Sequence, residues 1–160
     1  MTIKVGEKIP SATLATMTAE GPKPISTDDL FKGKKVVMFA VPGAFTPTCS
    51  AKHLPGFVEN ADKIKAKGVS TIACVAVNDP FVMGAWGKDQ KVGDKVLMLA
   101  DGSAKFADAL GTVLDLSERG LGKRSRRYSM IVDNGVVKSL NVEEGGAFEV
   151  SGADTILKQL

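Results

Sequence analysis

A single cysteine, Cys49, ends a stiff loop in the segment VPGAFTPTCS, residues 41–50. An apolar run precedes this loop and helical spacing follows it, so we expect Cys49 at a strand-to-helix junction. The positive end of the helix dipole and unpaired backbone N–H groups there favour a thiolate, the nucleophilic form of cysteine. Thr46 lies close enough to hydrogen-bond the sulfur if the loop turns. Pro42 and Pro47 stiffen the loop, and Pro42 can shield the site from water.

Two other interpretations of this region stay open. A free cysteine is often a small buried hydrophobe, which would make Cys49 inert. His53 follows Cys49 by four residues and would share its face of a regular helix, as the base of a Cys–His hydrolase. No third orienting residue stands out, so we interpret His53 as a helix-surface histidine. With one histidine and no C-x-x-C, the sequence predicts no metal site.

The elements that must position these residues follow from the periodicity of the chain. Asp79 is expected to cap its helix, Gly68 to end the first long helix, and Pro55 to kink or split that helix. Ser151 and Asp154 have the spacing of a capping box. The predicted strands are 34–41, 69–77, 95–101 and a hairpin over 128–142; the predicted helices are 28–31, 48–68, 79–90, 104–111 and 151–160; residues 19–26 are predicted to be a loop.

This order of elements predicts an α/β fold with a mixed parallel and antiparallel sheet, covered by helices on both faces. A chain of 160 residues with 44% hydrophobic residues suits one domain, residues 1–160. No stretch is apolar enough to span a membrane, and the N-terminus has no apolar signal region. Two cysteines are too few for a disulfide framework. We therefore expect a cytoplasmic protein with reduced thiols.

The segment GKRSRR, residues 122–127, carries four cations in six residues. A nucleic-acid patch is one interpretation, but the net charge of the chain is only +3, and we predict no nucleic-acid partner. We interpret Lys123 and Arg124 as part of a solvated loop. Arg126 and Arg127 precede a predicted strand, where side chains alternate between faces, so only one of them can point toward the thiol.

Three separated blocks of the sequence resemble the peroxiredoxins, in their type II or peroxiredoxin-5 branch. They are VPGAFTPTCSAKHLPGFVENADKIKAKGV, CVAVNDPFVMGAW and RRYSMIVDNGVVKSLNVE, and the likeness extends from about Val5 to Leu160. The resemblance implies a thioredoxin-like fold and reduction of hydrogen peroxide and alkyl hydroperoxides. It assigns Cys49 as the peroxidatic thiol and Pro42, Thr46 and Arg127 as its catalytic partners.

The implied chemistry needs no cofactor. The Cys49 thiolate would attack one peroxide oxygen and become a sulfenic acid while the other oxygen leaves. Negative charge moves from the sulfur to the leaving oxygen, so fixed hydrogen-bond donors must stabilise it at both atoms. The Arg127 guanidinium, the Thr46 hydroxyl and the Cys49 backbone N–H are the expected donors.

Cys74, within a predicted strand, is either a buried inert thiol, which we favour, or a resolving thiol. The second role requires the first turn of the Cys49 helix to unfold. Some members of the family hold a resolving cysteine near the C-terminus, where this chain has Val150. We therefore expect an external reductant: glutaredoxin with glutathione, or thioredoxin.

Family resemblance also implies a homodimer. The loop after Cys49 and the segment NDPFV, residues 78–82, contribute to the dimer face in the family. Phe45, Phe81, Met83 and Trp86 could belong to this face or to the core.

Overall fold

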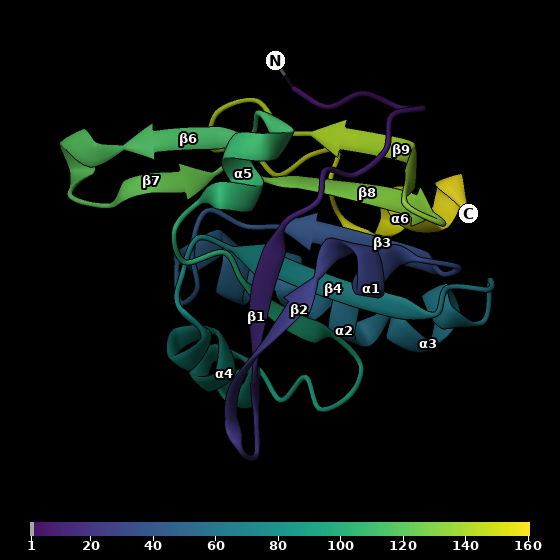
Figure 1. Ribbon diagram of the computed structural model, residues 1–160, viewed down its shortest axis with the longest axis horizontal. Coiled ribbons are helices and arrows are strands. Elements are labelled where there is room, and N and C mark those ends of the chain that lie inside the picture. The colour runs from purple at the N-terminus through teal and green to yellow at the C-terminus, as the bar shows by residue number, and fades with distance from the viewer. Residues whose placement is uncertain (1) are drawn as a thin grey trace.

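A computed structural model describes residues 2–160 (Figure 1). Its main sheet has the strand order β2-β1-β5-β4-β3-β8-β9, and two further strands, β6 and β7, form a separate arm. The strands are β1 Thr13–Thr18, β2 Gly21–Ser26, β3 Lys35–Ala40, β4 Thr71–Ala76, β5 Leu97–Ala100, β6 Val113–Leu116, β7 Gly122–Ser125, β8 Tyr128–Asp133 and β9 Val136–Val142. The α-helices are α1 Thr27–Phe31, α2 Leu54–Glu59, α3 Ala61–Lys65, α4 Pro80–Asp89, α5 Lys105–Leu110 and α6 Ala153–Gln159; Cys49–His53 is a π-helical turn and Ser117–Arg119 a 3₁₀ turn.

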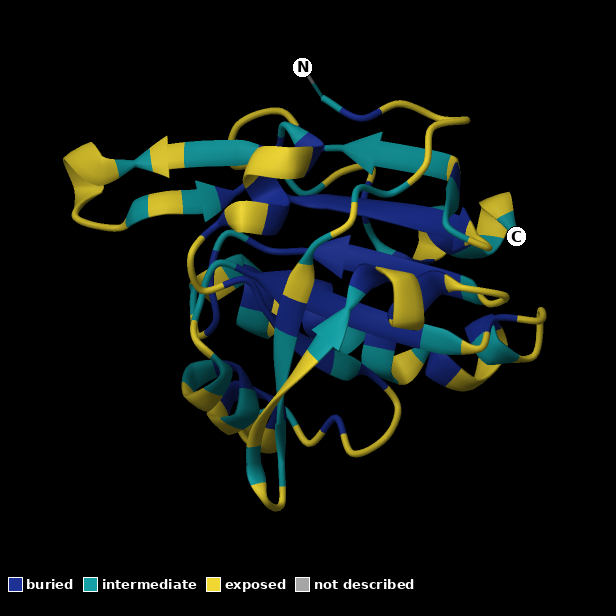
Figure 2. Ribbon diagram, viewed as in Figure 1, coloured by how far each residue is buried: buried dark blue, intermediate teal, exposed yellow. Residues whose placement is uncertain are grey.

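The sheet is mixed, as the sequence predicts. Strands β3, β4 and β5 are parallel, whereas β8 runs antiparallel to β3 and forms a hairpin with β9. Alternate residues of β3 face opposite sides of the sheet, and two apolar clusters result. Phe39 belongs to the cluster that contains residues of α2, α3, α4 and α6, while Met38 belongs to the cluster that contains residues of α1 and α5. Helices thus cover both faces of a continuous buried centre (Figure 2).

Two predicted loops are strands in the structure. Residues 19–26 include β2, which pairs with β1 at the edge of the sheet, and 122–127 include β7, which pairs with β6. Pro22 and Pro24 suggested a loop because proline cannot donate to a strand ladder, but an edge strand tolerates proline. The β7 segment is polar because the strand is half exposed, and it therefore lacks the apolar pattern that predicts a strand.

The helix after the Cys49 loop departs from the prediction in one respect. Pro55 lies in the first turn of α2, directly after the π-helical turn, and the break between α2 and α3 falls instead at Asn60. The Leu54 N–H donates to the Cys49 carbonyl, five residues back. Proline has no N–H to continue the α-helical ladder, so a wider turn before it costs little.

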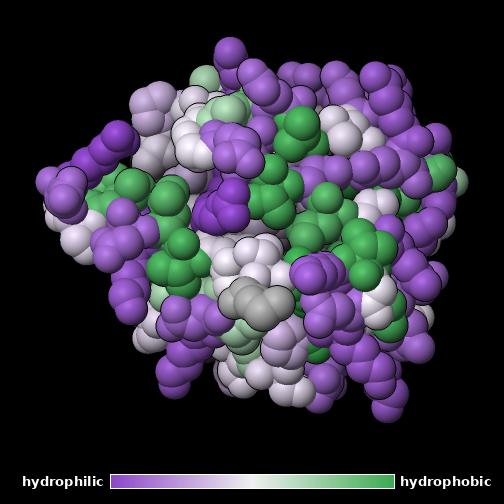
Figure 3. All heavy atoms as spheres, turned by 90° about the horizontal axis from the view of Figure 1, so that it is seen from above, coloured by the Kyte–Doolittle hydropathy of each residue, from purple (hydrophilic) through white to green (hydrophobic). Residues whose placement is uncertain are grey.

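The outer surface is largely polar where Figure 3 shows it from above, with hydrophobic residues interrupted by hydrophilic ones. Among residues 2–160, no helix combines the length and apolarity needed to cross a bilayer. Phe45 and Phe81 are exposed, whereas Met83 and Trp86 belong to the core.

Candidate active site

Cys49 lies at the start of the helix that follows β3, at the expected strand-to-helix junction. Helical backbone begins at Pro47, and the Ser50 N–H donates to the Thr46 carbonyl at 3.0 Å. The Cys49 side chain is wholly buried. Burial by itself favours a neutral thiol, so any ionisation of this sulfur needs a specific partner.

Arg127 supplies that partner. It directly precedes β8, and its Nη2 donates to Cys49 Sγ at 3.2 Å. Only 5% of Arg127 is exposed, and no carboxylate within residues 2–160 lies within 4 Å of its guanidinium. A guanidinium keeps its proton even when buried, so its charge must be balanced by a nearby group. The side-chain groups that this guanidinium contacts among residues 2–160 are the Cys49 sulfur and the His53 ring.

Arg126 points elsewhere. Its Nη2 donates to the backbone carbonyl of Glu143 at 3.1 Å, and it is half-buried. The alternation of side chains along the start of β8 therefore places one arginine at the sulfur and turns its neighbour away, as expected.

His53 is not the surface histidine that we predicted. It is wholly buried, because the wide π-helical turn and the neighbouring Phe57 and Phe148 rings enclose it. Its Nδ1 lies 2.9 Å from Arg127 Nη1, and its Nε2 lies 2.9 Å from the Ser151 carbonyl. Arginine can only donate and a carbonyl can only accept, so the proton sits on Nε2.

The charge state of His53 follows from the same neighbours. Burial first, and the Arg127 charge second, lower the pKa of His53 to about 3, against smaller opposing effects of the Ser151 carbonyl and Glu143. His53 is neutral at physiological pH, and its only lone pair is engaged by Arg127. It cannot serve as a base for Cys49, which removes the basis of the Cys–His hydrolase.

A buried carboxylate organises the far side of His53. Glu143 Oε2 accepts hydrogen bonds from the backbone N–H groups of Glu149, Val150 and Ser151, and from the Ser151 hydroxyl at 2.6 Å. Burial opposes ionisation, but these hydrogen bonds outweigh it and lower the pKa of Glu143. The predicted capping box is therefore wrong. The Ser151 hydroxyl donates to Glu143, and the N-cap of α6 is Gly152, which makes no side-chain hydrogen bond.

The expected hydrogen bond from Thr46 to the sulfur is absent within residues 2–160. The Thr46 hydroxyl donates instead to the Gly43 carbonyl at 2.7 Å, three residues back. This bond closes the turn of the loop. It also commits the hydroxyl proton, so the Thr46 oxygen faces any ligand as an acceptor.

The loop before Cys49 is held from two sides. The Ala44 N–H donates to Asn78 Oδ1 at 2.9 Å, and Arg124 Nη1 donates to the Pro42 carbonyl at 3.3 Å. Arg124 is thus no solvated loop residue, because β7 brings it against the loop. A Cβ atom on Gly43 would lie 2.5 Å from that nitrogen, so a larger residue there would displace the Arg124 guanidinium from the loop.

Phe45 shows that this loop is held rather than relaxed. Its φ is +64°, in the left-handed region, which costs a bulky residue on the order of 1–3 kcal/mol. Such a conformation persists only where neighbouring contacts fix it.

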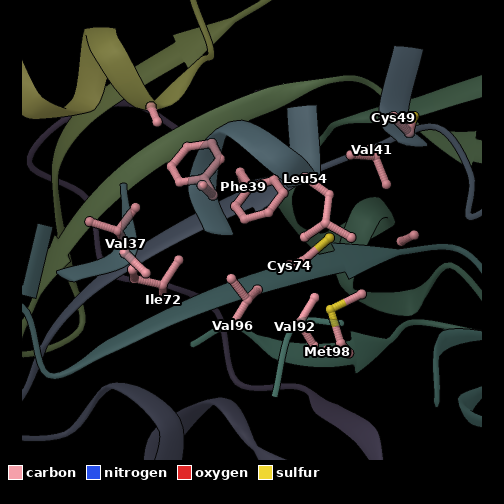
Figure 4. Close-up of a cluster of buried hydrophobic side chains, with 14 of the residues drawn as sticks. Val37, Phe39, Val41, Cys49, Leu54, Ile72, Cys74, Val92, Val96 and Met98 are labelled. Carbon is pink, nitrogen blue, oxygen red and sulfur yellow. The ribbon is translucent and has the colours of Figure 1, made fainter. Parts of the chain in front are cut away.

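Cys74 belongs to the same apolar cluster as Cys49 but has different neighbours. In Figure 4 its side chain lies among the apolar side chains at the centre of the cluster, whereas Cys49 lies at the edge beside Val41. Burial raises the pKa of the Cys74 thiol well above its usual value, helped by charge at Cys49 and opposed by Arg127. Both cysteines are free thiols.

Sequence reasoning named Cys49, Thr46, Arg127 and Pro42 but missed the residues that support them. Arg124 was assigned to a solvated loop and Glu143 carried no signal, because their contacts join segments far apart in the chain. Asn78 did carry one: it directly follows the second buried strand, whose end lies at the same edge of the sheet as Cys49.

Comparison with known proteins places this arrangement in a family. A family model described as Redoxin matches residues 4–157. The Oryza sativa subsp. japonica protein "Peroxiredoxin-2E-2, chloroplastic" is 56% identical over 164 residues, covering 99% of this chain and 73% of the relative. "Peroxiredoxin-2B" of Arabidopsis thaliana is 50% identical over 159 residues, covering 99% of this chain and 98% of the relative. The chain is a peroxiredoxin.

A solved structure supports the same assignment. The crystal structure titled as reduced Prx3 in complex with H₂O₂, from Vibrio vulnificus, superposes with a TM-score of 0.95 at 56% identity, covering 99% of each chain. Relatives of this similarity place the peroxiredoxin in the type II branch and give it the thioredoxin-like fold. It is a thiol peroxidase that reduces peroxides.

Proposed function

We propose that Cys49 is the peroxidatic thiol, and that Arg127 both ionises it and stabilises the charge that develops during attack. The observation that carries this assignment is the 3.2 Å contact between Arg127 Nη2 and Cys49 Sγ, made by a buried guanidinium without a carboxylate partner among residues 2–160. The Arg127 Nε is buried and makes no hydrogen bond to these residues.

The reaction follows from these groups. The Cys49 sulfur forms a bond to one peroxide oxygen, the O–O bond breaks, and the sulfur is oxidised to a sulfenic acid. The other oxygen leaves with the electron pair and takes up a proton, giving water or an alcohol. The Thr46 oxygen accepts a hydrogen bond from the peroxide O–H, and Arg127 donates to the oxygen that gains charge. Pro42 shields the reacting atoms from water.

An external thiol completes the cycle in this proposal. Cys74 is wholly buried, and the position that carries a resolving cysteine in some relatives is Val150. Glutaredoxin with glutathione is the reductant that we favour, and thioredoxin is the alternative. Steady-state peroxide consumption with each donor, at equal peroxide concentration, discriminates between them. Consumption that requires neither donor would contradict the external-thiol cycle.

A homodimer is also proposed, through the exposed rings of Phe45 and Phe81, which are 53% and 65% exposed. The Phe45 ring lies 6.5 Å from Trp86, next to the site, so a dimer contact here would cover the Cys49 loop. Sedimentation of the parent and of Phe81→Asp tests this: the parent should sediment as a dimer and the variant as a monomer. A monomeric parent would contradict the proposal.

We further propose that the protein works in the cytoplasm and acts on both hydrogen peroxide and alkyl hydroperoxides. The two free thiols suit a reducing compartment. Cell fractionation tests the location, and parallel assays with hydrogen peroxide and an alkyl hydroperoxide test the substrate range.

A further inference from the structure

Few hydrogen bonds fix the direction of the Arg127 guanidinium apart from the one to His53. Its guanidinium makes side-chain hydrogen bonds to two groups within residues 2–160, His53 Nδ1 and Cys49 Sγ. The Phe148 ring lies 5.8 Å from its central carbon and limits motion without fixing the direction of any N–H. When Cys49 becomes a sulfenic acid, the sulfur loses its charge, and His53 is the remaining fixed acceptor.

His53 is itself fixed at both ends. Its Nε2 proton is committed to the Ser151 carbonyl, and Ser151 is held by two hydrogen bonds to Glu143. The ring packs against Phe39 and Phe57 at centroid distances of 4.9 and 5.6 Å. The hydrogen bond of Nε2 to Ser151 therefore sets the orientation in which Nδ1 accepts from the guanidinium.

We propose that His53 is a positioning residue for peroxide reduction, holding Arg127 by Nη1 so that Nη2 stays directed at Cys49 Sγ. This inference rests on the proposed function of Cys49 and Arg127. A carboxylate at position 53 would also fix the guanidinium, but it would neutralise the charge that the thiolate needs. An uncharged imidazole fixes the arginine and leaves its full charge for the sulfur and the leaving oxygen.

Two substitutions separate positioning from stability. His53→Asn places an amide oxygen near the position of Nδ1 and keeps an acceptor for Arg127, but it loses the ring packing and the Ser151 bond. His53→Leu keeps apolar packing but removes the acceptor. If His53 positions Arg127, His53→Leu should react with peroxide more slowly than His53→Asn, although it packs better. If His53 is only structural, the variant with the lower melting temperature should react more slowly.

The measurement is the second-order rate constant of Cys49 oxidation by hydrogen peroxide, followed by stopped-flow fluorescence of Trp86. This is the sole tryptophan, and its Nε1 donates to Ser50 Oγ at 3.0 Å, beside Cys49. We expect a loss of about 10- to 100-fold for His53→Leu and of less than about 5-fold for His53→Asn. The melting temperature of each variant is measured in parallel, and rates are compared where all are folded.

Phe57→Leu is the matched control, since it loosens the packing around His53 and leaves the hydrogen bonds to Arg127 intact. It should lower the melting temperature while the rate stays within about 2-fold of the parent. A His53→Leu rate equal to that of the parent, or equal losses in the Leu and Asn variants, would overturn the positioning role alone. A parent protein whose Cys49 does not react with peroxide would overturn the proposed function, and this inference with it.

Discussion

Two thiols share one apolar cluster, and among residues 2–160 only Cys49 has a polar side-chain partner. Cys49 and Cys74 are both wholly buried. Cys74 lies within β4 beside Phe39 and Met98 of the adjacent strands, and burial raises the pKa of its thiol. Cys49 instead contacts Arg127. Burial alone favours the protonated form of a thiol. A buried cation beside the sulfur, with no carboxylate to neutralise it, favours the thiolate.

The largest effect is expected for Cys49→Ser. A hydroxyl at this position is far less acidic than a thiol and cannot form a sulfenic acid, so peroxide consumption should fall to the rate of the blank. Stopped-flow peroxide consumption with excess dithiol measures it. Turnover that survives in this variant would mean that Cys74 reacts, which would break the comparison.

Arg127→Ala should reduce the rate of Cys49 oxidation by about 10²–10³-fold, because the sulfur loses its cation and the leaving oxygen loses its donor. The same stopped-flow assay measures the change. Arg126→Ala is the control: its guanidinium binds the Glu143 carbonyl, and its rate should stay within about 3-fold of the parent. Equal losses in the two variants would contradict the assignment of Arg127.

Lowering the pH should reduce the free energy of unfolding, because His53 beside Arg127 stays neutral in the folded protein. Its pKa of about 3 in the folded protein lies below the ordinary value of 6.5, so only the unfolded chain binds a proton as pH falls between them. Stability is then lost with falling pH, by about 1.4 kcal/mol per unit below pH 6.5. Glu143 adds to the loss only below the ordinary carboxyl value of 4.5, since its own pKa is lowered.

Denaturant unfolding at several values between pH 5 and 6.5 isolates the contribution of His53. It is the sole histidine of the chain, so His53→Leu should flatten the dependence by about one proton. An unchanged slope in that variant would show that His53 does not carry the effect.

The smallest effect is expected for Cys74→Ala. Removing a buried inert sulfur should cost about 1 kcal/mol of unfolding free energy and leave peroxide turnover within about 2-fold of the parent. Denaturant unfolding and steady-state turnover measure the two quantities. If turnover is lost while the first oxidation of Cys49 persists, Cys74 is a resolving thiol that forms a disulfide with oxidised Cys49.

The sequence predicts much of this site because the loop, its cysteine and the start of β8 carry local signals. Phe39 and its neighbours formed a continuous apolar run, and the alternation before β8 limited the choice to Arg126 or Arg127. Local pattern could not reveal that His53 is buried, because a π-helical turn changes which residues share a face. It also could not reveal Glu143, whose hydrogen bonds depend on how β9 and the segment before α6 meet.

The most direct test of the central claim treats the reduced protein with less than one equivalent of hydrogen peroxide and a reagent that traps sulfenic acids. Mass spectrometry then locates the label. We expect label on Cys49, its loss in Arg127→Ala on the same time scale, and an unmodified Cys74 in the folded protein. Label on Cys74, or none on Cys49, would contradict the role of Cys49 as the peroxidatic thiol.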